Sequence, residues 1–207
     1  MPLFFRDPKQ DKLKPIKTKQ MKTLKLIAIV AMTTLMSCGG STNKQSADAD
    51  GFGAIEKEIK NKFGDNAYYT DLAITYNKSI GNIITVTVTD NPESLKMGQW
   101  DQTQNAWKQN SEISLEVPQG SKAADFMFQL NEKINLSKLG GLVEKSSLQL
   151  SSEKNIENPA LYMAFVKFPK NGDIAKAEYT VMLKPENGGT TFSFYYKLDG
   201  ELITMDY

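Results

Sequence analysis

The clearest structural signal in the chain is the segment Asp71-Leu-Ala-Ile-Thr-Tyr-Asn-Lys-Ser-Ile-Gly-Asn-Ile-Ile-Thr-Val-Thr-Val-Thr89. Apolar and polar side chains alternate on both sides of its centre, with the apolar ones at Leu72, Ile74, Tyr76, Ile84, Val86 and Val88. A period of two is typical of a strand with one buried face. The centre is rich in Asn, Ser and Gly, which favour turns. The segment therefore predicts an antiparallel β-hairpin.

An amphipathic helix is predicted just before the hairpin. Ile55, Ile59 and Phe63 recur every four residues, and most of the side chains between them are charged. This spacing places the three apolar side chains on one face of a helix. We expect the helix to cover residues 53–63 and to end at Gly64, because glycine is common just after the last turn.

Two further strands are predicted after the hairpin, and they complete a first unit of one helix and four strands over residues 53–120. The third strand is expected over 95–100. The fourth is expected over 107–117, where apolar residues again alternate with polar ones, and the turn Asp101–Asn105 separates the two.

The remaining residues, 121–207, repeat this order. Apolar residues with helical spacing predict a helix over 137–152. Strands are then expected over 161–168, 177–183, 191–198 and 201–207. The segment Ala123–Leu130 is ambiguous: its alternation slightly favours a strand, and a helix is the alternative.

These elements predict an α+β fold, with antiparallel sheet and a helix packed on one face, built as a tandem helix-plus-four-strand pseudo-repeat. The order resembles the cystatin-like, PepSY and β-lactamase-inhibitor-like repeat modules of exported bacterial lipoproteins. The resemblance covers about residues 53–207 and is topological. It implies a module that binds proteins or peptides, or inhibits enzymes.

The N-terminal part contains an export signal. Basic residues precede an apolar run over Leu26–Met32, and Leu35-Met-Ser-Cys38 follows. This order is typical of a secretory signal peptide, and its end resembles a bacterial lipobox. The resemblance implies that residues 21–37 are removed and that Cys38 is diacylglyceryl-modified and acylated, for example with palmitate. The alternative is an ordinary secretory peptide that ends near a free cysteine.

The flanks of this signal carry two further predictions. Residues 1–20 are interpreted as an over-extended start that is absent from the mature protein, and residues 38–52 as a flexible tether. Gly39 follows the cysteine, and no acidic run comes after it. The Asn- and Lys-rich composition resembles that of Bacteroidetes lipoproteins, in which an acidic run after the cysteine marks export to the cell surface. In enteric lipoproteins, an aspartate after the cysteine signals retention in the inner membrane. The resemblance therefore implies the periplasmic face of the outer membrane.

Composition excludes several classes of function. The chain has 25 basic and 24 acidic residues, of which residues 1–37 hold eight and two, so cleavage leaves 17 and 22 and a net charge of −5. A mildly acidic domain is a poor nucleic-acid binder. The chain has no histidine, which removes the commonest general base and zinc ligand. We therefore expect no enzyme activity, no cofactor and no metal.

Six aromatic residues are the candidate contacts for a partner or ligand: Trp100, Trp107, Tyr68, Tyr69, Tyr195 and Tyr196. On an exposed sheet face they would form a platform for a partner's side chains or for sugar rings. Alternatively, they are strand formers that pack in the core. The two tryptophans flank a turn and are the first choice. Four methionines are interpreted as core filler: Met97, Met127, Met163 and Met182.

The sequence thus favours a non-enzymatic, lipid-anchored periplasmic protein that binds an unknown protein or peptide. The alternative is a module that binds a small ligand or glycan on a concave aromatic sheet face. An aromatic-lined pocket would favour the alternative, and a flatter apolar patch would favour a protein partner.

Overall fold

The computed structural model describes residues 45–207. The predicted extension 1–20, the signal peptide 21–37, Cys38 and the first part of the tether lie outside the described residues.

The described chain follows the order predicted from sequence. Helix α2 (Ala49–Phe63) precedes the strands β1 (Tyr68–Asn77), β2 (Gly81–Thr89), β3 (Lys96–Thr103) and β4 (Ala106–Ser114). Helix α3 (Leu136–Lys154) precedes the strands β5 (Ala160–Lys167), β6 (Glu178–Lys184), β7 (Phe192–Lys197) and β8 (Leu202–Asp206). The α+β class is confirmed.

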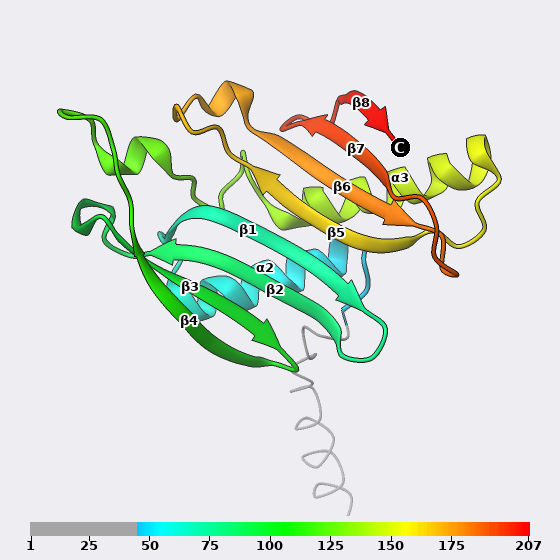
Figure 1. Ribbon diagram of the computed structural model, residues 1–207, viewed down its shortest axis with the longest axis horizontal. Helices are drawn as coiled ribbons and strands as arrows, with labels where there is room; N and C mark the ends of the chain where they lie inside the picture. The colour runs from blue at the N-terminus through cyan, green and yellow to red at the C-terminus, as the bar shows by residue number, and fades with distance from the viewer. Residues whose placement is uncertain (1–44) are drawn as a thin grey trace, which may run out of the picture. The chain divides into compact units, whose positions relative to one another are not determined.

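The two halves share one antiparallel sheet of eight strands in the order β4-β3-β2-β1-β5-β6-β7-β8 (Figure 1). The first strand of each half therefore lies at the centre. There β1 pairs with β5, with Leu72 opposite Val166 and Thr75 opposite Met163. Each half continues outward from this seam as a meander.

The hairpin predicted over residues 71–89 is confirmed. Leu72 faces Val86 and Ile74 faces Ile84, so the apolar residues of both strands share one face. The Asn77 side chain accepts hydrogen bonds from the amides of Ser79 and Ile80, which closes the turn.

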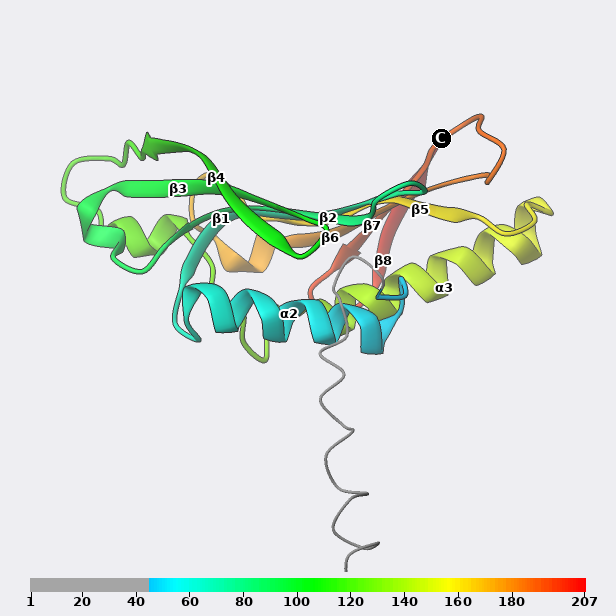
Figure 2. The same ribbon diagram turned by 90° about the horizontal axis from the view of Figure 1, so that it is seen from below.

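Both helices cover the same face of the sheet (Figure 2). Helix α2 buries Phe52, Ile55 and Ile59, and α3 buries several apolar residues of its own: Leu136, Leu139, Leu142, Val143 and Leu150. These side chains join the inward residues of the strands in one core. The hydrophobic effect thus fixes the helices to one side.

The helices also approach each other closely. A Cβ atom on Gly140 would collide with the backbone of Asp48, the residue that caps the start of α2. A glycine in a helix interior is destabilising by itself, so the close approach accounts for its presence in α3.

Two sequence predictions about local structure are wrong. Residues 49–52 were assigned to the tether, but α2 begins at Ala49, and Phe52 is fully buried. The Asp48 side chain accepts a hydrogen bond from the amide of Gly51 at 2.7 Å, which caps the helix four residues before the buried Phe52.

The second wrong prediction concerns Ala123–Leu130, where the alternation of apolar residues slightly favours a strand. The segment forms a short 3-10 helix, Ala123–Phe126, followed by a single bridge from Phe128 to Tyr69. Its alternation has another cause: Phe128 and Leu130 enter the main core, whereas Met127 enters a small second cluster with Met97 and Ala123. The segment therefore connects two clusters rather than adding a strand.

Candidate functional site

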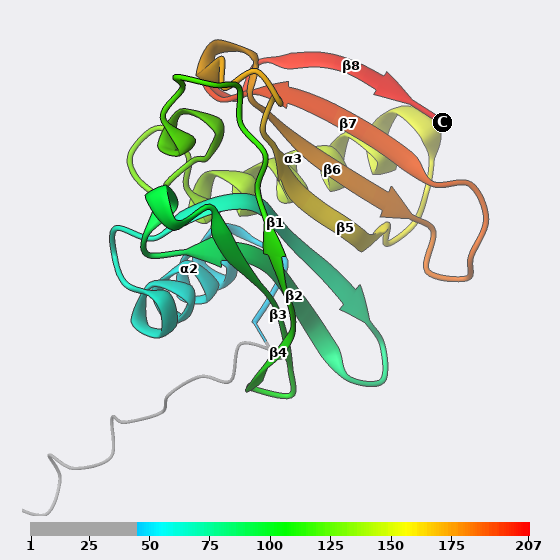
Figure 3. The same ribbon diagram turned by 60° about the vertical axis from the view of Figure 1, so that its left-hand side comes forward.

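Within residues 45–207, α2 and α3 leave one face of the sheet without a helix, and Figure 3 shows β5 and β6 in front of α3 on that side. On β5 and β6, Ala164 and Val181 point into the core. Because successive side chains on a strand point to opposite faces, their neighbours Met163, Phe165 and Met182 point away from the helices.

Strand register aligns these outward residues in two rows across the sheet. The first row contains Ile83, Thr75, Met163 and Met182, each opposite the next. The second row contains Thr85, Ala73, Phe165, Thr180 and Tyr195. We call these nine residues the open face. It crosses the seam between the two halves.

The open face is apolar at its centre and charged at its border. Ile83, Met163, Phe165 and Met182 are half-buried, and none of them packs against the core clusters. At the border, Lys167 pairs with Glu178 at 3.0 Å. This combination of an apolar centre and a polar rim is the usual anatomy of a protein interface.

The structure does not gather the six candidate aromatics into a platform. Trp100 and Trp107 lie on the helix side of the sheet, with ring centroids 5.6 Å and 4.9 Å from that of Phe63 in edge-on contacts. They fix the β3–β4 hairpin to the end of α2. The ammonium group of Lys62 lies 4.8 Å from the Trp100 ring centre.

The four tyrosines are also dispersed. Tyr69 and Tyr196 are buried, so their prediction as contact residues is wrong. Both occupy inward positions, and the Tyr196 hydroxyl lies 2.8 Å from the hydroxyl of Ser146 on α3. Tyr68 packs against the second cluster. Tyr195 is the one candidate of the six that belongs to the open face, through its register with Thr180.

Sequence reasoning missed Met163, Phe165 and Met182 as surface residues. Met97 and Met127 are buried, as the core interpretation of the methionines predicted, but Met163 and Met182 lie on the open face. The signal in the sequence is that β5 is apolar at nearly every position, on both of its faces. That signal suggests a sheet covered on both faces, and two helices cover only one.

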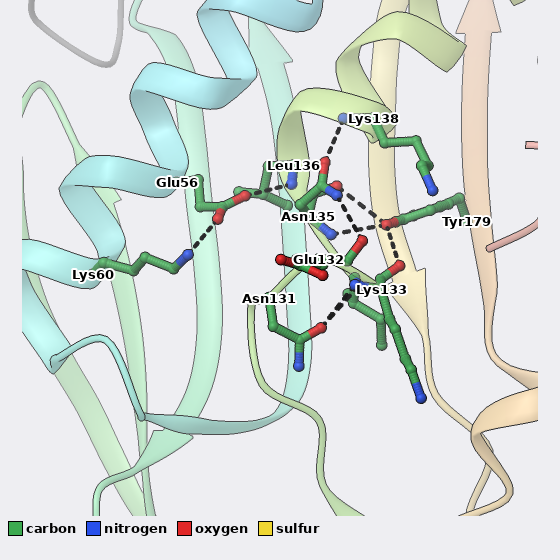
Figure 4. Close-up of polar contacts among 10 residues, drawn as sticks. Glu56, Lys60, Asn131, Glu132, Lys133, Asn135, Leu136, Lys138 and Tyr179 are labelled. Carbon is green, nitrogen blue, oxygen red and sulfur yellow. Dashed lines mark hydrogen bonds and ion pairs between the residues drawn. The ribbon is translucent and has the colours of Figure 1, made fainter. Parts of the chain in front are cut away.

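A polar network joins the two halves beneath the sheet (Figure 4). The Glu56 carboxylate on α2 accepts hydrogen bonds from the Leu136 amide at 2.7 Å and from the Lys60 ammonium group at 2.6 Å. The Tyr179 hydroxyl on β6 accepts a hydrogen bond from the Asn135 amide at 2.9 Å. The network satisfies amide groups at the start of α3.

Burial dominates the ionisation of the tyrosines near this network. Burial, partly offset by the hydrogen bond with Asn135 and aided by the charge of Glu56, raises the pKa of Tyr179 to about 12. Burial and then the charge of Glu56 also raise the pKa of Tyr69. Both hydroxyls therefore stay neutral at physiological pH, which suits a structural role.

Two hollows of the described chain lie away from the open face. A cleft of about 660 Å³ is lined by Gln45, Ala47, Tyr76, Pro159 and Leu161, among others. A second, of about 370 Å³, lies beside Trp100 and includes Asp90, Gln109 and Glu112.

Within residues 45–207, no three acidic or cysteine side chains are grouped so that they could hold a metal ion. Over the same residues, no helix has the length and apolar character needed to cross a bilayer.

No protein-family model matches the chain, and no curated protein matches it in sequence. Among solved structures, a "putative lipoprotein" from Clostridium difficile 630 is similar to it, at 11% identity and a TM-score of 0.47. The match covers 80% of this chain and 97% of that one. Similarity at this level does not establish a common fold.

Proposed function

We propose that the chain is a lipid-anchored protein of the bacterial cell envelope that binds a protein or peptide partner on its open face, without catalysis. The lipobox at Leu35–Cys38 supports the anchor. A lone cysteine in an exported chain has no partner for an intramolecular disulfide, and lipidation gives it a role. The periplasmic face of the outer membrane is the location that the residues after Cys38 favour.

The apolar centre of the open face is the observation that carries the binding proposal. An antiparallel sheet with helices on one side normally presents polar residues on the other. Here Ile83, Met163, Phe165 and Met182 instead lie in two adjacent rows, half-buried and outside both core clusters. Contiguous apolar surface of this kind marks interaction sites, and methionine adapts its shape to different partners.

A protein partner fits the open face better than a sugar does. Sugar rings stack on exposed aromatic rings, and the two aromatic residues of the open face, Phe165 and Tyr195, are half-buried and separated by Thr180. The polar cleft beside Trp100 favours the glycan alternative, because carboxylates and an amide surround an aromatic wall. However, the Lys62 ammonium group lies over that ring and would have to move before a sugar could stack.

Site-specific photo-crosslinking in intact cells tests the proposal. A photo-reactive residue replaces Met163 on the open face or, as the control, the exposed Lys57 on α2. We expect one protein to be captured in stoichiometric amount from position 163 and not from position 57. Equal capture from both positions, or crosslinks from position 163 to glycan or lipid alone, would contradict the proposal.

A further inference from the structure

We infer that the end of the sheet where the described chain begins is the surface that faces the bilayer, with Tyr76, Ile80 and Leu148 in contact with lipid. This inference rests on the proposed lipid anchor at Cys38. It adds an orientation to the proposed function and is independent of the identity of the partner.

Four segments meet at this end, which we call the anchor-side end. They are residues 45–47, the end of the β1–β2 hairpin at 76–81, Gln104 between β3 and β4, and residues 159–161 at the start of β5. They line the cleft of about 660 Å³. A neighbouring hollow of about 300 Å³ shares Ala47, Pro159 and Leu161 with it and extends to Leu148 on α3.

Large apolar side chains are exposed on the rims of these two hollows. Tyr76 is 41% exposed and Leu148 is 72% exposed, whereas most leucines among residues 45–207 are buried. Single exposed apolar residues need no explanation, but these two border adjoining hollows. Tyrosine favours the interface between water and lipid, because its ring is apolar and its hydroxyl is polar.

A cation lies at the same end. The exposed Lys78 is in the β1–β2 turn, and its ammonium group is 3.1 Å from a carboxylate oxygen of Glu186. Lysine can extend its apolar stem along a lipid surface while its charge stays among the headgroups. The turn therefore combines an aromatic, an aliphatic and a basic residue, which is the composition of an interfacial contact.

The length of the tether indicates that the bilayer is what contacts the anchor-side end. Seven consecutive Cα–Cα distances separate Cys38 from Gln45, and they span at most about 25 Å when the chain is fully extended. Gln45 itself lines the cleft. The strands that run from this end have lengths such as the 10 residues of β1, or about 33 Å. A lipidated Cys38 therefore keeps Gln45 within about 25 Å of the bilayer, and when the anchor-side end contacts lipid the opposite strand ends lie farther away.

This orientation has a consequence for partner binding. When the strands run away from the bilayer, the open face points along the membrane plane rather than into it. A partner in the same membrane or beside it can then reach Met163 and Phe165 without passing beneath the domain.

Fluorescence quenching on the lipidated, mature protein in vesicles of phosphatidylethanolamine and phosphatidylglycerol tests the orientation. Because Cys38 is the only cysteine and lipidation consumes its thiol, one introduced cysteine takes the label. Ser79→Cys places the label in the exposed β1–β2 turn, and Ser121→Cys places it in an exposed turn beyond the far end of β4. The quencher is a nitroxide on the lipid headgroup or upper acyl chain.

We expect several-fold stronger lipid quenching at position 79 than at position 121. Tyr76→Glu combined with Leu148→Glu should reduce quenching at 79 to the level at 121 while the protein still floats with the vesicles. Equal quenching at the two positions would overturn the orientation and leave the anchor intact. Quenching at 79 that disappears when protein density is lowered would show that a second copy covers this end. A protein that fails to float would overturn both the anchor and the orientation.

Discussion

The carboxylate of Glu56 on α2 accepts a hydrogen bond from the amide of Leu136, the first residue of α3, at 2.7 Å. This contact spans 80 residues of sequence and joins the helix of one half to the helix of the other. Together with the β1–β5 seam, it makes one structural unit of two halves that have the same order of elements.

Glu56→Ala should lower the free energy of unfolding by about 1.5–3 kcal/mol, because a hydrogen bond to a charged group is lost and a buried amide is left unpaired. Glu56→Gln keeps an acceptor oxygen and should lower it less. Urea unfolding measures both. A matched control is Lys57→Ala, which changes an exposed neighbour. If the Ala variant at position 56 unfolds at the same urea concentration as this control, the contact contributes nothing.

Gly140→Ala should destabilise the protein by about 1–3 kcal/mol, as expected for overpacking, because the new Cβ meets the backbone of Asp48. Gly141→Ala is the matched control. Its Cβ would lie 3.9 Å from the Cβ of Ala49, an ordinary contact, so the better helix propensity of alanine should stabilise the protein by about 0.5–1 kcal/mol. Thermal unfolding of the two variants gives opposite shifts. Shifts of the same sign would contradict the close helix contact.

Stability should fall between pH 10 and pH 12. The pKa of Tyr179 is raised to about 12 in the folded state, and in the unfolded chain it is about 10. The neutral form is therefore favoured by folding, so its contribution is complete below pH 10 and is lost as the pH rises through 12.

Tyr179→Phe should make this loss of stability shallower and, at pH 8, should cost about 1 kcal/mol through the lost hydrogen bond with Asn135. Urea midpoints measured from pH 8 to pH 12 show both effects. Tyr76→Phe removes a hydroxyl from an exposed side chain and serves as the control. An unchanged slope in the Tyr179 variant would mean that this residue does not titrate with unfolding.

A charge should destabilise the domain much more at one residue of β5 than at its neighbour. Ala164 is fully buried on the helix side, so Ala164→Asp should destabilise the domain by about 3–5 kcal/mol or prevent folding. Phe165 is half-buried on the open face, where an aspartate reaches water, and Phe165→Asp should cost about 1 kcal/mol. Circular dichroism and urea unfolding compare them. Equal damage from both substitutions would show that the open face is part of the core.

Much of the fold could be predicted from local patterns. The alternation over residues 71–89 predicted the β1–β2 hairpin, and helical spacing around Leu139 and Leu142 predicted α3. These patterns arise from burial on one face of a single element, so they are present in the sequence of that element. The union of both halves in one sheet depends on the pairing of β1 with β5, which lie far apart in sequence, and no local pattern encodes it.

The candidate site was harder to predict for the same reason. Met163 and Phe165 are apolar residue types that are common in protein cores. They lie outside the core because both helices pack on the other side of the sheet. Trp100 and Trp107 flank a turn, which predicts an exposed contact, but both pack against Phe63 at the end of α2. That contact required the position of the helix under the hairpin.

The affinity of the purified lipoprotein for the protein captured at position 163 tests the central claim most directly. Phe165→Glu places a charge in the apolar centre of the open face, and Lys57→Glu changes a charge on the helix side as a control. Since loss of a central aromatic anchor typically costs 2 kcal/mol or more, we predict that Phe165→Glu raises the Kd by a factor of about 30 or more, and that Lys57→Glu leaves it within about twofold. Unchanged affinity of a folded Phe165→Glu variant would show that the partner does not bind the open face.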